Sequence, residues 1–206
     1  MRSEMITVGV TGGIASGKTL VCRTFRRLGA YLIDADEIGH QVLREHKIIS
    51  ALIDYFGREM LDGNGNIDRA RLAELAFASK EALQKLNEIT HPTIEARIRE
   101  KLERLERSGY PGVVVIDAAV LGEWELVKEL THVVFVDSPQ WHRLKRLIDE
   151  RKLDQKEAER RIKAQEEMLE KVSPYVTIVI KNTGEPDELR AKVMIAWRKI
   201  CAREET

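Results

Sequence analysis

Short β-branched runs alternate along the chain with longer charged segments whose apolar residues recur at helical spacing. This alternation is typical of strands and helices arranged around a parallel sheet. The runs that predict strands are residues 6–10, 31–33, 113–116, 132–136 and 176–180. Five such strands favour an α/β fold of the doubly wound kind, with helices covering both faces of a five-stranded parallel sheet.

The spacing of these strands is uneven. About eighty residues separate the second predicted strand from the third, far more than one crossover helix requires. Apolar residues at helical spacing fill this stretch, namely Ile48, Leu52, Tyr55, then Leu72, Leu75, Ala76, then Ile94, Ile98, Leu102 and Leu105. They predict an inserted helical subdomain. Inside it, the sequence DGNGN at residues 62–66 predicts a tight turn.

A second long segment, residues 142–171, lies between the fourth and fifth predicted strands. Acidic and basic side chains interleave along it, and the spacing predicts two helices. Two interpretations stay open. The segment is either a pair of solvated helices stabilised by i,i+4 ion pairs, or the lid of a kinase.

The first predicted strand runs directly into GGIASGKT, which satisfies the Walker A pattern G-x-x-x-x-G-K-[ST]. Glycines let the backbone curl so that N–H groups point at phosphate oxygens, and the following helix presents its positive end to the same anion. Lys18 is expected to reach the β- and γ-phosphates, and Thr19 to bind Mg²⁺. The predicted nucleotide-binding residues here are Gly12, Gly13, Ile14, Ala15, Ser16, Gly17, Lys18, Thr19 and Leu20.

Carboxylates follow the second and third predicted strands, at the edge of the sheet where ligands of open α/β sheets bind. Asp36 is expected to orient an attacking hydroxyl or to accept its proton. For Asp34, a functional role and a role as helix cap remain equally open. Asp117 closes the third strand as a Walker B carboxylate does, and is expected to hold Mg²⁺.

Composition limits the remaining possibilities. A chain of 206 residues with 43% apolar residues forms one main domain with insertions, and 34 basic residues balance 34 acidic ones. No net charge therefore indicates nucleic acid or an anionic membrane as a partner. The two cysteines, Cys22 and Cys201, are far apart and suggest neither a disulfide framework nor a zinc site. Without a secretory or membrane-spanning run, the expected location is the cytoplasm.

Several segments, in this order, resemble the dephospho-coenzyme A kinase family. They are GVTGGIASGK at residues 9–18, GAYLIDADEIGHQVL at 29–43, Asp68-Arg69, His91-Pro92, RIKAQ at 161–165 and Asn182-Thr183-Gly184. The resemblance covers essentially the whole chain. It implies that the γ-phosphoryl group of ATP, with Mg²⁺, moves to the ribose 3′-hydroxyl of dephospho-coenzyme A, the last step of coenzyme A biosynthesis.

The resemblance also implies which segments of the chain form each functional part. Residues 1–37, 110–140 and 172–206 would form the nucleotide-binding core, residues 38–109 the helical subdomain that binds dephospho-coenzyme A, and residues 141–171 the lid. The implied enzyme is a cytoplasmic monomer that acts on a small molecule, without nucleic acid or membrane.

Individual roles follow from the same resemblance. Asp36 matches the family's base, and Lys18 and Arg146 would stabilise the transferring phosphoryl group with it. The residues expected to bind the acceptor are Asp36, Arg69, His91, Leu121, Glu123 and Arg161. Asn182 and Gly184 would border the adenine. Taken alone, His91-Pro92 also fits the start of a helix, since proline suits the first turn.

Some positions depart from the family pattern. Residues 119–123, AVLGE, stand where many members have Pro-Leu-Leu-Phe-Glu. The Asp-Ala-Ala form at residues 117–119 resembles the kinase half of the bifunctional coenzyme A synthase of animals. Residues 150–153, ERKL, replace Arg-Asp-Gly-Leu in the lid. Two alternatives therefore stay open: a P-loop kinase for a nucleoside or nucleotide, and a non-catalytic module that binds ATP as a switch.

Overall fold

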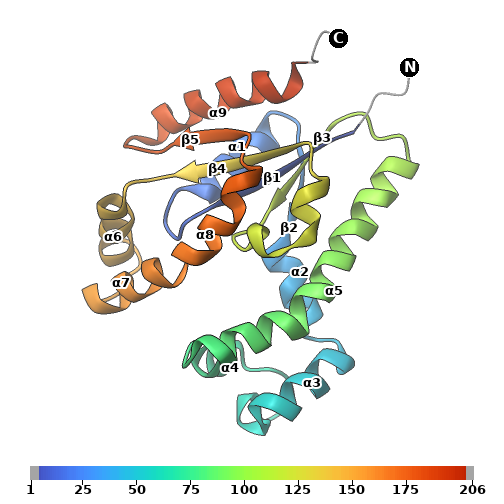
Figure 1. The fold of residues 1–206 in the computed structure, drawn as a ribbon, viewed down its shortest axis with the longest axis vertical. Coiled ribbons are helices and arrows are strands. Elements are labelled where there is room, and N and C mark those ends of the chain that lie inside the picture. The colour runs from blue at the N-terminus through green and yellow to red at the C-terminus, as the bar shows by residue number, and fades with distance from the viewer. Residues whose placement is uncertain (1–4, 203–206) are drawn as a thin grey trace. The chain divides into compact units, whose positions relative to one another are not determined.

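The computed structural model describes residues 5–202, apart from the side chains of residues 166–168. Residues 35–101 form one compact unit, here called the helical unit. The rest of the described chain forms a second unit, here called the sheet unit (Figure 1). Within residues 5–202, no helix is both long enough and apolar enough to cross a membrane.

A parallel sheet of five strands, in the order β2-β3-β1-β4-β5, organises the sheet unit (Figure 1). The strands are β1 (Ile6–Gly12), β2 (Tyr31–Asp34), β3 (Val113–Asp117), β4 (His132–Asp137) and β5 (Ile178–Lys181). The predicted sheet is confirmed. The fifth strand begins two residues later than expected. The N–H of Val176 closes a turn on the carbonyl of Ser173, and the N–H of Thr177 makes the first backbone bond to β4, at the carbonyl of Val133.

Burial explains why the central strands are almost uniformly apolar. Residues 113–116 of β3 are buried, as are Val8 and Val10 of β1, since helices cover both faces of a parallel sheet. On one side, α1 (Lys18–Arg27) packs against α9 (Pro186–Cys201), and the rings of Phe25 and Trp197 lie 5.9 Å apart. This contact fixes the helix that begins at the phosphate-binding loop.

Strand register brings the predicted site residues to one edge of the sheet. Val10 of β1 pairs with Asp117 of β3, and Asp117 pairs with Asp34 of β2. All five strands run in the same direction, so their carboxyl ends meet where β1 leads into the loop.

Residues 140–172 form three helices where the sequence predicted two, so that prediction is wrong. They are α6 (Gln140–Asp149), α7 (Gln155–Ala164) and α8 (Glu166–Val172). Gln165 ends α7 and precedes α8, and no glycine or proline marks this break. Leu147, Ala158 and Ile162 form a small buried cluster between α6 and α7.

The same cluster reaches the phosphate-binding loop, because Ile14 and Ala15 pack against it. The solvated interpretation of this segment is therefore incomplete. On α7 the charged side chains of Lys156, Glu159 and Arg160 are exposed, while the apolar side chains of α6 and α7 pack against the loop.

We expect Ile162→Ala to loosen this cluster without unfolding the sheet. Ile162 is fully buried, and such truncations cost about 2–5 kcal/mol. Hydrogen exchange should speed up in α6 and α7 while the amides of β1 and β3 keep their protection. Lys163→Ala, at the exposed neighbouring position, is the control. Equal loosening of helices and strands would show that the cluster is not a separate packing element.

The helical unit contains α2 (Ala35–Val42), α3 (His46–Phe56), α4 (Arg69–Ala76) and most of α5 (Lys80–Arg107). Its buried apolar residues include Ile48, Leu52, Leu72, Ile94 and Ile98, in agreement with the predicted helical spacing. Tyr55 is an exception. Its side chain is exposed, and the next residue, Phe56, is buried instead.

Pro92 does not start a helix, so that interpretation of His91-Pro92 is wrong. It lies in the interior of α5, a helix of 28 residues. Proline has no N–H and cannot donate to the carbonyl four residues earlier, so this helix lacks one of its internal hydrogen bonds.

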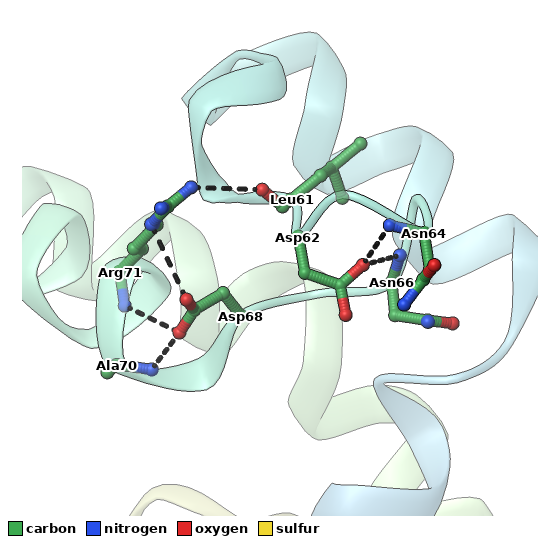
Figure 2. A network of polar contacts seen from close by, with 7 residues as sticks. All are labelled: Leu61, Asp62, Asn64, Asn66, Asp68, Ala70 and Arg71. Atoms are coloured by element: carbon green, nitrogen blue, oxygen red, sulfur yellow. Dashed lines mark hydrogen bonds and ion pairs between the residues drawn. The ribbon is translucent and has the colours of Figure 1, made fainter.

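The predicted turn at residues 62–66 is present (Figure 2). Oδ1 of Asp62 accepts hydrogen bonds from the backbone N–H groups of Asn64 and Asn66, each at 2.9 Å. These two bonds are the main reason why the pKa of Asp62 lies below its ordinary value. An antiparallel bridge between Leu61 and Ile67 closes the turn.

Candidate functional site

Residues 13–17 form the loop between β1 and α1. The N–H of Ser16 donates to the carbonyl of Gly13 at 3.0 Å, which closes a turn within the loop. Ala15 has φ 59° and Gly17 has φ 99°, both in the left-handed region. For a non-glycine residue this conformation is strained, and at Ala15 the surrounding contacts maintain it.

The loop is shaped to receive an anion. A Cβ at Gly12 would lie 2.6 Å from the carbonyl oxygen of Val136, and one at Gly13 would collide with the guanidinium of Arg143. The hydroxyl of Ser16 is buried and finds no hydrogen-bond partner among the described residues. Because α1 begins at Lys18 and has no acidic residue in its first turn, its positive end is available to phosphate oxygens. These features fit the phosphates of ATP.

Lys18 forms an ion pair with the Asp117 carboxylate. Both side chains are mostly buried, at 16% and 14% exposure, so solvent screens the pair only in part. The predicted Walker A lysine and Walker B carboxylate therefore lie together at the carboxyl edge of the sheet.

Thr19 and Asp117 supply hydroxyl and carboxylate oxygens, the ligands that Mg²⁺ prefers. Thr19 is exposed in the first turn of α1. Among the described side chains, no group of three or more His, Cys, Asp or Glu residues could hold a metal ion.

Cys22 lies one helical turn after Lys18 and is buried. Burial raises the pKa of its thiol, and the negative charge of Asp117 raises it further. Cys22 and Cys201 are both free thiols.

We expect a thiol reagent to distinguish the two cysteines. The thiolate is the reactive form, so Cys22, which is buried and protonated, should stay unmodified in the folded protein. The exposed Cys201 should be alkylated first, although partial burial also raises its pKa. Iodoacetamide labelling followed by peptide mass spectrometry measures both sites. Labelling of Cys22 at the rate of Cys201 in the folded protein would contradict its packing in the core of the sheet unit.

Arg146 of α6 and Asn182, directly after β5, both bind the loop backbone. Nη1 of Arg146 donates to the carbonyl of Ala15 at 2.9 Å, and Nδ2 of Asn182 donates to the carbonyl of Ser16 at 2.7 Å. Nη2 of Arg146 also donates to Oδ1 of Asn182 at 3.5 Å. The predicted lid arginine is thus placed at the loop.

The other predicted residues of the sheet unit lie apart from these contacts. Nε of Arg161 donates to Glu157 at 2.8 Å along α7, and the hydrogen bonds of Arg161 and Arg160 hold the pKa of Glu157 below its ordinary value. Glu123, in the short helix Leu121–Glu123, accepts from Lys171 at 3.4 Å. Of the remaining predicted residues in this unit, Leu20 packs on the core, Leu121 is buried and Gly184 is exposed.

The helical unit carries the remaining predicted residues. Asp36 is exposed in the first turn of α2. Asp68 caps α4 by accepting from the N–H groups of Ala70 and Arg71 (Figure 2). Arg69 is the first residue of that helix. Nη1 of Arg69 lies 2.6 Å from Nε2 of His40, within the same unit. His91 lies in α5 and is partly buried.

Two residues that contact the loop were not among the predicted site residues. Oε1 of Gln165 accepts from the N–H of Ile14 at 2.5 Å, and Arg143 lies against Gly13. Gln165 ends the RIKAQ segment, which contributed to the family resemblance, but no role of its own was predicted for this residue. Arg143 follows a tryptophan and a histidine in a charged run, and no motif of its own distinguishes it.

A five-stranded parallel sheet whose first strand leads through a Walker A loop into a helix, with a lysine, a carboxylate and an arginine at that loop, defines a P-loop kinase. The family model described as dephospho-CoA kinase matches residues 6–188. The chain therefore belongs to the dephospho-CoA kinase family, and the predicted family is confirmed.

Individual relatives agree with this assignment. A dephospho-CoA kinase of Dehalococcoides mccartyi is 39% identical over 93% of this chain and 96% of its own length. A crystal structure of a Thermus thermophilus protein superposes with a TM-score of 0.78 and is 30% identical, covering 97% of this chain and all of that one. A dephospho-CoA kinase structure from Campylobacter jejuni has a TM-score of 0.61 at 28% identity, covering 95% of this chain and 97% of its own.

Proposed function

We propose that this chain transfers the γ-phosphoryl group of Mg·ATP to the 3′-hydroxyl of dephospho-coenzyme A, which yields coenzyme A and ADP. The observation that carries the proposal is the family match over residues 6–188, in a chain whose Walker A lysine is paired with the carboxylate that ends β3. The acceptor, the metal and the individual residue roles are parts of this proposal.

On the donor side, the loop N–H groups and the N-terminus of α1 bind the phosphates. Lys18 exchanges its contact with Asp117 for the β- and γ-phosphate oxygens. Asp117 and Thr19 would hold Mg²⁺, which would neutralise charge on those oxygens. Arg146, already bonded to the loop carbonyl of Ala15, adds a positive charge beside the transferring group. These groups stabilise negative charge and form no covalent bond with it.

On the acceptor side, Asp36 orients the 3′-hydroxyl and accepts its proton. Arg69, fixed at the start of α4 by the Asp68 cap, and His91 bind the acceptor from the helical unit. Residues 38–109 then act as the acceptor subdomain and residues 141–171 as the lid. Arg161 would leave Glu157 and bind the acceptor when the lid closes.

The test is an assay of ADP release with Mg·ATP and a panel of acceptors. Dephospho-coenzyme A should give turnover, with a product whose added phosphate is on the 3′-oxygen by mass spectrometry and phosphorus NMR. Nucleosides and nucleotides should give little, and chelation of Mg²⁺ should stop the reaction. Faster turnover with a nucleotide would replace the proposal by a nucleotide kinase. ATP binding without turnover on any acceptor would indicate a non-catalytic module.

A further inference from the structure

Asn182 is a buried polar residue in the sheet unit, with 3% of its surface exposed. It directly follows β5, and its backbone N–H donates to the carbonyl of Asp137 at 2.7 Å. That bond extends the β4–β5 ladder by one residue beyond the last register pair, Asp137 with Lys181. The backbone of Asn182 is therefore fixed by the sheet, and its carboxamide has a defined position.

Both ends of this carboxamide are used. Nδ2 donates to the carbonyl of Ser16 at 2.7 Å, and Oδ1 accepts from Arg146 at 3.5 Å. A carbonyl can only accept and a guanidinium can only donate, so just one orientation of the amide satisfies both partners. An aspartate or an apolar residue of the same size could not make both bonds.

The bond to Ser16 orients a peptide of the phosphate-binding loop. In a trans peptide the C=O of one residue and the N–H of the next point in opposite directions. Holding the carbonyl of Ser16 toward Asn182 therefore turns the N–H of Gly17 toward the other side of the loop. No backbone acceptor for this N–H is found among the described residues.

Gly17 itself supports this arrangement. Its φ of 99° disfavours any side chain, and a Cβ there would collide with Nδ2 of Asn182. The second loop glycine of the Walker pattern is thus required here for the close approach of Asn182 as well as for its torsion angle.

We propose that Asn182 is a positioning residue for the phosphate-binding loop. It holds the Ser16–Gly17 peptide with its N–H directed at the nucleotide phosphates, and it joins Arg146 to the same peptide. The inference rests on the proposed function only in that the loop binds the phosphates of ATP. It differs from the adenine-bordering role that the family resemblance implies, because the amide acts on the phosphates through the loop.

The variant Asn182→Leu tests this role, since it keeps the approximate size and charge of the side chain but removes both hydrogen bonds. Binding of ATP, GTP and inorganic tripolyphosphate is measured by competition with a fluorescent ATP analogue. The affinities for ATP and for tripolyphosphate should fall by the same factor, on the order of tenfold or more. The preference for ATP over GTP should not change. Asn64→Leu, the same change in the exposed turn, is the control.

Each outcome decides the inference. If the affinity for ATP falls while the affinity for tripolyphosphate stays unchanged, or if the ratio of the ATP and GTP affinities changes, the inference is overturned in favour of an adenine contact. Unchanged binding of both ligands would overturn it as well. If Asn182→Leu does not fold, Asn182→Ala, which strains the core less, is measured in the same way. A wild-type protein that binds no ATP would refute the proposed function instead.

Discussion

Lys18→Ala is expected to lower kcat/KM for dephospho-coenzyme A by about a thousandfold or more. Phosphoryl transfer depends on positioning and on charge neutralisation, and Lys18 is a cation placed directly after the loop, at the start of α1. The fold should persist, because the Lys18–Asp117 pair lies at the carboxyl edge of the sheet, while α1 and β3 also pack through the buried side chains of Val21, Phe25 and Val115. A cost of about 1 kcal/mol would lower the Tm of a chain of this size by about 2–4 °C.

The measurement combines steady-state kinetics with thermal unfolding of the same samples. Lys199→Ala, an exposed lysine of α9 far along the chain from the loop, is the control and should change neither quantity. Lys18→Arg should recover little of the rate, since a guanidinium is larger and planar. Near-normal turnover of Lys18→Ala would exclude this loop as the phosphate-transfer site.

Most of the fold could be predicted because the sheet is buried on both faces. Such strands read as nearly continuous apolar runs, and the runs at 113–116 and 132–136 differ from the observed strands by one residue at most. The Walker A loop was equally clear, because its spacing encodes the geometry of phosphate binding. Both signals are local in sequence.

Features that depend on contacts between distant segments were not predictable in this way. The break at Gln165 carries no glycine or proline, and its meaning becomes visible only when Oε1 of Gln165 reaches the N–H of Ile14, 151 residues earlier. Asn182 similarly bonds to Ser16 across 166 residues. Both side chains act on the loop backbone, and backbone partners leave no pattern of paired residue types in the sequence.

The sequence predicted carboxylates where the second strand ends, and the structure places Asp34 and Asp36 in different secondary-structure elements. Asp34 ends β2 in register with Asp117, whereas Asp36 lies in the first turn of α2. We therefore expect different effects at the two positions: Asp34 acts on the side of the metal and nucleotide, and Asp36 acts on the acceptor, as proposed above.

Asp36→Asn is expected to lower kcat by about a hundredfold while ATP binding stays within about twofold of wild type. Asparagine keeps the size of the side chain and can still orient a hydroxyl, but it cannot accept the proton. Asp34→Asn should instead weaken Mg·ATP binding, because the side chain neighbours Asp117 in the sheet. Asp54→Asn, on the exposed face of α3, is the control for the charge change.

Single-turnover rates and nucleotide titrations on the three variants separate these effects. If Asp36→Asn lowers the single-turnover rate and the ATP affinity by the same factor, Asp36 contributes only to ligand binding. The proton of the 3′-hydroxyl then leaves to solvent or to the phosphate oxygens. If Asp34→Asn shows the larger loss of rate with intact ATP binding, the base is the carboxylate that ends β2. In that case α2 contributes only helix stability at this site, since acidic residues in a first turn also favour the helix dipole.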